Sequence, residues 1–351
     1  MLKSGSFHHI TLSFLISVTL CGTTHATTIY VWGSHGDKIQ DDGIDIAVNG
    51  DTVIVRGGTY TGEGNVNLDF NGKAIVVRSE SGPSVTIIDC ESTPQTRGVT
   101  FENNETSASK LIGFTIRNGS AQWFPVGSGG GIYIGSSPTI ENCIIENCKA
   151  NVGGGIQIFS SISVITPTIR NCTFISNSAT SASGVGGAIN CAQNARPNIY
   201  DCKFESNFAE YSCGAIAVGD YSGVDVTITS CVFNGNYGDG WGGAICADGR
   251  TTITNCTFAR NDAKFDGAAL SASGDSAVVE FTRNIVAFNL ETGVETSSGA
   301  TMSFSCNDFY ENEGGSFTGI YDSTDVDVNT IFEDPLFCDM DNDNYYLFAL
   351  R

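Results

Sequence analysis

Basic residues are scarce in this sequence: 17 Lys and Arg stand against 38 Asp and Glu, which gives a formal net charge of −21. A surface of that sign repels the phosphates of nucleic acids and the head groups of anionic membranes. We therefore expect no nucleic-acid partner. The excess of carboxylates suits a solvated surface outside the cell, with cation binding as the alternative interpretation.

Long apolar runs are also missing. The apolar run from Ile10 to Leu20 is too short to cross a bilayer, so we expect no membrane span. Lys3 precedes this run and the small-residue sequence Thr24-His25-Ala26 follows it, which is typical of a secretory signal peptide. We predict a signal peptide over residues 1–26 and a secreted protein, extracellular or on the cell surface.

The rest of the chain is dominated by a short repeated motif, and no stretch of these repeats shows a helical period over three turns. Gly-Gly-Ala-Ile occurs at 186–189 and 242–245, followed by Ile-x-Asp/Asn-Cys-x-Phe-x-x-Asn at 199–207 and 253–261. The Cys position recurs every 23 to 30 residues and is filled by Phe114, Cys143, Cys172, Cys202, Cys231, Cys256, Asn284 and Asn307. The position three residues before it and the position two residues after it are apolar in every copy. This period predicts a solenoid.

Each copy contains short β-type runs broken by Gly, Asn and Ser. Side chains alternate along a strand, so Ile253 and Phe258 both face inward only if the chain bends between Asn255 and Cys256. Asn tolerates the left-handed conformation that such a bend requires. We interpret the Asn before each Cys as a stacked turn residue rather than a ligand. The expected fold class is all-β, a parallel β-helix of about ten coils.

The paired Gly-Gly-Ala-Ile and Phe-x-x-Asn phrases resemble the repeat of the polymorphic outer membrane proteins. The wider pattern, over roughly residues 27 to 348, is similar to secreted right-handed parallel β-helix proteins with the pectin-lyase-like fold. The fold hosts lyases, hydrolases, adhesins and phage spikes, so it does not define an activity. Unlike the polymorphic outer membrane proteins, the sequence shows no translocating barrel or anchor helix, and we expect neither self-export nor membrane anchoring.

We expect one cooperative domain over residues 27–351, because neighbouring coils share a continuous core. The expected parts are an N-terminal cap at 27–55, coils at 56–312 and a closing segment at 313–351. A solenoid end exposes core and unpaired backbone, so a cap is required. Within it, Lys38 to Val48 is predicted as a short amphipathic capping helix, with Ile39, Ile44 and Ala47 on its apolar side.

Five cysteines, Cys143, Cys172, Cys202, Cys231 and Cys256, occupy one inward column. Parallel side chains on adjacent coils keep their Cβ atoms about 4.8 Å apart, farther than the ~3.8 Å usual for a disulfide. We therefore interpret the column as buried, stacked thiols. Its linear arrangement does not suit tetrahedral metal binding. Other cysteines lie off the column, and some of these are expected to pair: Cys148, Cys191, Cys213, Cys246, Cys306 and Cys338.

We expect no cofactor, with Ca²⁺ as the alternative. Asp339, Asp341 and Asp343 alternate as the acidic ligands of a Ca²⁺ loop do. The segment lacks the Gly and the distal Glu of such a loop.

In enzymes of this fold, the resemblance implies a site on the outward face of the strand after the Gly-Gly. Parity predicts that this face carries Tyr133, Gln157, Asn190, Ala217, Cys246 and Ser271, then Gly135, Phe159, Ala192, Gly219, Asp248 and Ser273. Elimination needs clustered carboxylates with a base, and hydrolysis needs two carboxylates at a set spacing. Only Asp248 among these residues is a carboxylate, which argues against catalysis. For an enzyme, the candidate catalytic residues would be Asp239, Asp248 and Asp266.

Aromatic residues gather in the turns that enter this strand, and Tyr133 lies on its outward face. Such side chains stack on sugar rings or pack on a protein partner. The alternative is that they cover the edge of the core. The predicted ligand-binding residues are Trp123, Tyr133, Tyr211, Tyr237, Trp241 and Phe265.

The sequence as a whole therefore favours a non-catalytic secreted or surface protein that binds glycans or proteins. We expect it to be a monomer. The alternative is a polysaccharide lyase or glycoside hydrolase of the pectin-lyase-like superfamily.

Overall fold

The computed structural model describes residues 26–33, 36–122, 127–221, 223–297, 299–320, 326–339 and 344–347. Residues 1–25 of the predicted signal peptide lie outside the described residues, and so does Trp123. The same holds for Asp341 and Asp343 of the predicted Ca²⁺ loop.

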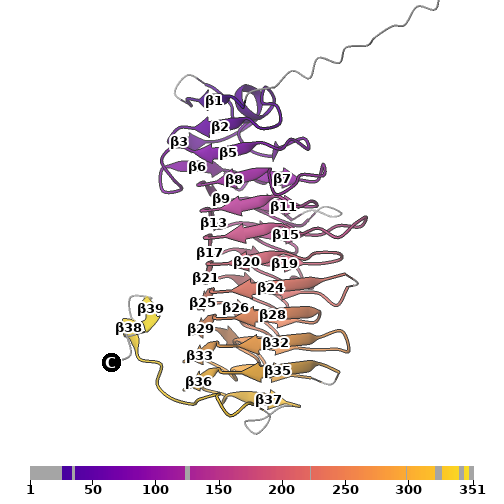
Figure 1. Ribbon diagram of the computed structural model, residues 1–351, viewed down its shortest axis with the longest axis vertical. Helices are drawn as coiled ribbons and strands as arrows, with labels where there is room; N and C mark the ends of the chain where they lie inside the picture. Colours follow the sequence, from indigo (N-terminus) through magenta and orange to yellow (C-terminus); the bar gives the residue numbers. More distant parts are fainter. Residues whose placement is uncertain are drawn as a thin grey trace, which may run out of the picture.

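The chain winds into a stack of coils, each of which contributes one strand to each of several parallel sheets (Figure 1). One coil shows the order: β12 (Thr139–Glu141) in the first sheet, β13 (Ile144–Glu146) in the second, β14 (Lys149–Ala150) in a short sheet and β15 (Ile156–Ile158) in the third. In the described part of the chain these sheets have 11, 10, 6 and 10 strands, respectively. The predicted all-β parallel solenoid is confirmed.

The other strands of the first sheet are β1 (Thr28–Val31), β2 (Thr52–Val55), β5 (Val76–Ser79), β8 (Lys110–Ile112), β16 (Thr168–Arg170), β20 (Asn198–Tyr200), β24 (Asp225–Thr229), β28 (Arg250–Thr254), β32 (Val278–Thr282) and β35 (Thr301–Ser305). Those of the second sheet are β3 (Gly58–Tyr60), β6 (Thr86–Asp89), β9 (Thr115–Arg117), β17 (Thr173–Ile175), β21 (Lys203–Glu205), β25 (Val232–Asn234), β29 (Thr257–Ala259), β33 (Ile285–Ala287) and β36 (Asp308–Tyr310).

The short sheet also contains β10 (Ser120–Ala121), β18 (Ser178–Ala179), β22 (Phe208–Ala209), β26 (Tyr237–Gly238) and β30 (Asp262–Ala263). The third sheet also contains β4 (Leu68–Asp69), β7 (Val99–Phe101), β11 (Ile132–Ile134), β19 (Ile189–Cys191), β23 (Ile216–Val218), β27 (Ile245–Ala247), β31 (Leu270–Ala272), β34 (Val294–Thr296) and β37 (Phe317–Gly319). Strands β38 (Phe337–Asp339) and β39 (Asn344–Leu347) form an antiparallel pair, drawn beside the stack in Figure 1.

The parallel register places each residue beside the equivalent residue of the neighbouring coil. Ile140 pairs with Leu111 and Ile169, and Phe204 pairs with Phe174 and Phe233. The rings of Phe174, Phe204 and Phe233 stack nearly parallel with centroids 4.8 and 4.7 Å apart. Burial of each such side chain stabilises the fold by about 1.5–3 kcal/mol. The apolar columns of the sequence therefore form one continuous core.

The bend between the first and second sheets lies at the residue before the Cys column, as predicted. Asn142, Asn171 and Asn255 have φ values of 53°, 51° and 55°, in the left-handed region. A single residue of this conformation turns the chain sharply enough for Ile253 and Phe258, on either side of it, both to point inward. Asn255 itself is exposed.

A second column of amides stabilises the turn after the second sheet. The amide nitrogen of Asn207 donates to the Phe174 carbonyl at 3.0 Å and to Oδ1 of Asn236 at 2.9 Å. Its backbone N–H donates to the same Oδ1 at 3.0 Å. The side chain is buried, so these bonds supply the partners that a buried amide requires.

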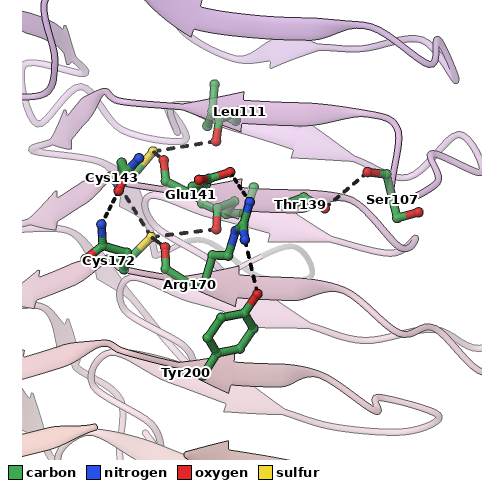
Figure 2. Close-up of polar contacts among 11 residues, drawn as sticks. Ser107, Leu111, Thr139, Glu141, Cys143, Arg170, Cys172 and Tyr200 are labelled. Carbon is green, nitrogen blue, oxygen red and sulfur yellow. Dashed lines mark hydrogen bonds and ion pairs between the residues drawn. The ribbon is translucent and has the colours of Figure 1, made fainter. Parts of the chain in front are cut away.

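The five column cysteines are free and buried. Figure 2 shows two of them, with each thiol aimed at backbone carbonyls. Sγ of Cys172 donates to the carbonyls of Arg170 and Ile140, at 3.2 and 3.8 Å. Arg170, at the end of β16, forms an ion pair with Glu141, at the end of β12, at 2.7 Å. The prediction of stacked thiols is confirmed.

The capping helix is shorter than predicted. It is a single π-helical turn, η1 (Gln40–Ile44), rather than a helix from Lys38 to Val48. The chain after this turn is held by Asp51, whose carboxylate accepts hydrogen bonds from the N–H groups of Val48 and Thr27, at 2.9 and 2.7 Å. Ile39, Ile44 and Ala47 are buried, as the apolar side of the predicted helix required. Within the described residues, no helix has the length and apolarity to cross a membrane.

The burial of the thiols predicts three classes of cysteine reactivity. Without reductant, iodoacetamide should modify exposed Cys306 in the native protein, and the five column cysteines only after unfolding, as read by peptide mass mapping. Cys213 and Cys246 should require both unfolding and reduction because they form a disulfide. Disulfides found within the column would contradict the stacked-thiol arrangement.

Replacement of Cys202 by Asp should destabilise the fold by several kcal/mol. The side chain is 1% exposed, and its thiol is directed at the carbonyl acceptors of Ile169 and Tyr200, which cannot satisfy a carboxylate. Denaturant unfolding would measure the loss. The Cys202→Ala variant is the control, because it removes the thiol without burying a charge. Equal stability of the two variants would show that the column tolerates charge.

Candidate functional site

A groove follows the outer face of the third sheet. Its floor and walls enclose about 680 Å³, and a second hollow of about 330 Å³ shares Val185, Cys213, Cys246 and Asp248 with it. The two hollows therefore form one continuous groove. The outward residues that line it include Tyr133, Gln157, Asn190, Ala217, Cys246 and Ser271, as parity predicted.

The register of the third sheet sets the order of the floor residues. Tyr133 pairs with Gln157, which pairs with Asn190, and the column continues to Ser271 and Glu295. Adjacent strands lie about 4.8 Å apart, so the column runs along the long axis of the stack. The Gly-Gly turn packs the coils closely here: a Cβ on Gly187 would lie 2.2 Å from the Gly214 carbonyl oxygen. Glycine is therefore required at the entry to this sheet.

A disulfide crosses the floor of the groove. Cys213, in the turn before β23, bonds to Cys246 on β27 in the next coil, with Cα atoms 5.2 Å apart. The sequence predicted that some off-column cysteines pair. The bond ties the floor to the turn that carries Trp241, whose carbonyl lies 3.4 Å from Sγ of Cys246.

Amides and a tyrosine form the floor toward the N-terminal end. The side-chain nitrogen of Asn190 donates to Oε1 of Gln157 at 2.9 Å. The guanidinium of Arg97 lies 5.3 Å from the ring centre of Tyr133. Burial lowers the pKa of Arg97 and raises that of Tyr133. This end of the groove is thus polar without a carboxylate on its floor.

Aromatic side chains stand at the rim of the carboxylate-rich end. Tyr211 and Trp241 line the hollow and are 49% and 42% exposed. Phe265, 49% exposed, packs against Trp241 with ring centroids 4.8 Å apart. These three predicted residues come together. Exposure to this degree leaves ring surface available for stacking on a ligand.

The remaining predicted residues lie elsewhere. Tyr237, on the short sheet, stacks on Phe208 at 5.9 Å and donates to Asp239 at 3.2 Å rather than lining the groove. Asp239 forms an ion pair with Lys264 at 3.1 Å. Asp266 accepts a hydrogen bond from Thr292 at 3.1 Å, close to the acidic end of the groove. Only Asp248 of the three candidate acids lines the hollows.

The expectation that this face carries a single carboxylate is wrong. Glu295 on β34 pairs in register with Ser271 and lines the same hollow as Asp248, and Asp220 lines the groove wall. The sequence reasoning missed Glu295 because its coil enters the strand through Thr292-Gly293 rather than Gly-Gly. Extension of the outward column by one further repeat beyond Ser271 would have found it.

Ser271 on β31 and Ser273, the residue directly after this strand, hydrogen-bond to the two carboxylates. Ser273 Oγ donates to Asp248 at 2.7 Å, and Ser271 Oγ donates to Glu295 at 2.6 Å. Burial raises the pKa of Asp248, and the charge of Asp220 adds to the effect. Burial also raises the pKa of Glu295, with contributions from the charges of Asp266 and Asp248. The serine bonds oppose both shifts without cancelling them.

No group of three His, Cys, Asp or Glu residues suitable for a metal ion occurs in the described ranges of the chain. The predicted Ca²⁺ loop lies largely outside those ranges.

Three comparisons relate the chain to known proteins. Residues 28–227 and 211–331 match the family described as the right handed beta helix region. Pectate lyase Pel9A superposes with a TM-score of 0.59 at 14% identity, over 94% of this chain and 91% of that chain. The A-module of mannuronan C-5 epimerase AlgE6 from Azotobacter vinelandii has a TM-score of 0.43 at 15% identity, over 87% of this chain and 90% of that one. Similarity of this degree reports the fold rather than an activity.

A sequence relative comes from Dictyostelium discoideum. Metabotropic glutamate receptor-like protein R is 35% identical over 117 residues, which are 33% of this chain and 7% of that protein. The chain therefore matches a small part of that relative.

The raised pKa values predict that the carboxylates of the groove oppose folding at neutral pH. A raised folded-state pKa means that stability is greatest below the unfolded pKa, about 4, and falls as pH rises through the folded pKa. The Asp248→Asn/Glu295→Gln variant should therefore melt at a higher temperature than the parent at pH 7, with the difference vanishing below about pH 4.

Thermal unfolding monitored by circular dichroism at a series of pH values would test this. Glu280→Gln, which alters an exposed carboxylate on the first sheet, is the matched control and should show little difference. A variant that is less stable than the parent at pH 7 would contradict the prediction.

Proposed function

The chain belongs to the right-handed β-helix family, and on this premise we propose that it binds an uncharged polysaccharide along the groove of the third sheet. The observation that carries the proposal is the exposed pair of Trp241 and Phe265 beside Tyr211, at the rim of a long polar groove. Aromatic faces stack on the apolar faces of sugar rings, and amides and hydroxyls bind their hydroxyl groups.

The charges of the groove favour an uncharged ligand. Asp220, Asp248 and Glu295 line it, whereas Arg97, whose guanidinium lies against the ring of Tyr133, is not among its described lining residues. A uronate polymer would bring further negative charge to these carboxylates on a chain whose net charge is −21. The hydroxyls of a neutral sugar instead donate to carboxylates and to the carbonyl oxygens of amides such as Gln157.

The dimensions of the groove suit an extended chain. Its floor passes from Tyr133 through four strand-to-strand steps to Cys246, which corresponds to roughly 19 Å at about 4.8 Å per step. Glu295 lies two steps farther. A polymer lying along the axis would contact the amide floor and the aromatic rim together, whereas a single sugar would contact one of them.

We propose as part of the same function that the protein is exported and acts as a single monomeric domain over residues 27–351. The signal-peptide pattern of residues 1–26 supports export, and the disulfide between Cys213 and Cys246 is of a kind that persists in oxidising compartments. The continuous core supports one domain.

Replacement of Trp241 by Ala should weaken polysaccharide binding by about 1–3 kcal/mol, the contribution of stacking at other aromatic platforms. The melting temperature should stay nearly unchanged because the side chain is 42% exposed. Isothermal titration with laminarin, xyloglucan and galactomannan would measure the affinity, and polygalacturonate and alginate would serve as charged counterparts. We expect no cleavage of the two uronate polymers, with or without Ca²⁺.

Trp32→Ala is the matched control, because Trp32 is 43% exposed but lies at the N-terminal cap under Arg56. It should leave binding unchanged. Preferential binding of polygalacturonate would overturn the proposal. So would a Trp241→Ala variant that melts far below the parent, because Trp241 would then belong to the core.

A further inference from the structure

Two of the carboxylates of the groove, Asp248 and Glu295, lie on opposite sides of one strand. Asp248 follows β27 in the coil before β31, and Glu295 lies on β34 in the coil after it. Each reaches toward β31, where Ser273 and Ser271 hold them. The two acids are thus separated both along the stack and along the strand, and they face the same hollow.

The serines also determine the spacing of the carboxylates. Ser271 and Ser273 are two residues apart on extended chain, so their positions differ by roughly 6.6 Å. Hydrogen bonds of 2.6 and 2.7 Å hold one carboxylate at each hydroxyl, on opposite sides of the strand. Carboxylates held at hydroxyls roughly 6.6 Å apart have room for a water molecule between them, as inverting hydrolysis at ~6.5–9.5 Å requires, unlike the ~5 Å of direct attack.

The hollow between the acids has features of a ligand site that do not depend on them. It encloses about 330 Å³, and Trp241 and Tyr211 stand exposed at its rim. It continues into the larger groove over Cys246. A polymer bound along the groove would pass over Cys246 and lie between Asp248 and Glu295.

The surroundings of the two acids differ in the charges that act on them. Glu295 has the higher ordinary pKa, and the charges of both Asp266 and Asp248 raise it further. Asp220 acts on Asp248. Glu295 therefore has more neighbouring negative charge than Asp248, which favours Glu295 as the proton donor of the pair.

We propose that Asp248 and Glu295 hydrolyse the glycosidic bond of the bound polysaccharide with inversion at the anomeric carbon. This inference rests on the proposed binding function. Glu295, as general acid, gives its proton to the glycosidic oxygen as the bond from the anomeric carbon to that oxygen breaks. Asp248, as general base, takes a proton from the water whose oxygen attacks the same carbon from the opposite face. One water is consumed: its hydroxyl group ends on the anomeric carbon, and the proton that Asp248 took returns through solvent to Glu295, which restores both acids.

Ser271 and Ser273 are positioning residues in this scheme. They stabilise the ionised form of each carboxylate and fix its direction, since an O–H donor bonded to a carboxylate oxygen limits its rotation. Elimination is disfavoured at this place, because the described lining of the hollow contains no Lys or Arg to act as a base.

The experiment measures reducing-end release from laminarin, xyloglucan and galactomannan, with binding to each polymer measured in parallel. The parent protein should cleave a polymer that it binds, and proton nuclear magnetic resonance should show the inverted anomer first. Glu295→Gln and Asp248→Asn should each lower kcat by about 10²–10⁴-fold while affinity stays within a few-fold. Glu280→Gln should retain full activity. The folded state of each variant is verified by its thermal transition.

The outcomes separate this inference from the binding function. Binding without any reducing-end release would overturn hydrolysis and leave the binding function standing. Absence of binding to every polymer would overturn both. A retained anomer would overturn the inverting mechanism, and full activity in either Glu295→Gln or Asp248→Asn would overturn the assignment of that residue.

Discussion

The structure depends on the parallel hydrogen-bond ladder between successive coils, which holds each residue directly over its equivalent in the next coil. Because the strands are parallel and in register, equivalent residues of successive coils lie about 4.8 Å apart and contact one another. Stacked Phe rings, buried thiols and buried Asn amides all use this spacing. Each of these side chains contacts its equivalent in the next coil, so the core is built from repeated local interactions along the axis of the stack.

The same ladder produces the groove, because outward residues stack as faithfully as inward ones. The outer face of the third sheet is therefore a row of side chains at fixed spacing. The residue type at this position differs from coil to coil, so the chemical character of the groove changes along its length. Amides occupy the N-terminal part of the row, and a disulfide and two carboxylates occupy the C-terminal part. Aromatic residues from the entering turns form the wall beside the carboxylates.

Cysteine shows how strongly position within the coil decides chemistry. The column cysteines stand on equivalent positions of successive coils, where parallel side chains keep their sulfur atoms from bonding, and they remain thiols. Cys213 lies in a turn and Cys246 lies on a strand of the next coil. Because these positions are not equivalent, the two side chains point toward each other and form a disulfide. The disulfide lies beside Trp241, on the face where the carboxylates are.

The sequence by itself determined the solenoid, its core columns, the left-handed bends at Asn142, Asn171 and Asn255, and most of the outward floor of the third sheet. These follow from the period and from side-chain alternation, which are local properties of the chain. Tertiary structure alone decided that Cys213 pairs with Cys246 and that Tyr237 turns away from the groove. It also decided that Ser271 and Ser273 hold Glu295 and Asp248. Coils differ in length, for example 33 residues between Gln157 and Asn190 but 24 between Ser271 and Glu295, and the intervening turns follow no period. Which turn residues meet therefore depends on the packing of neighbouring coils.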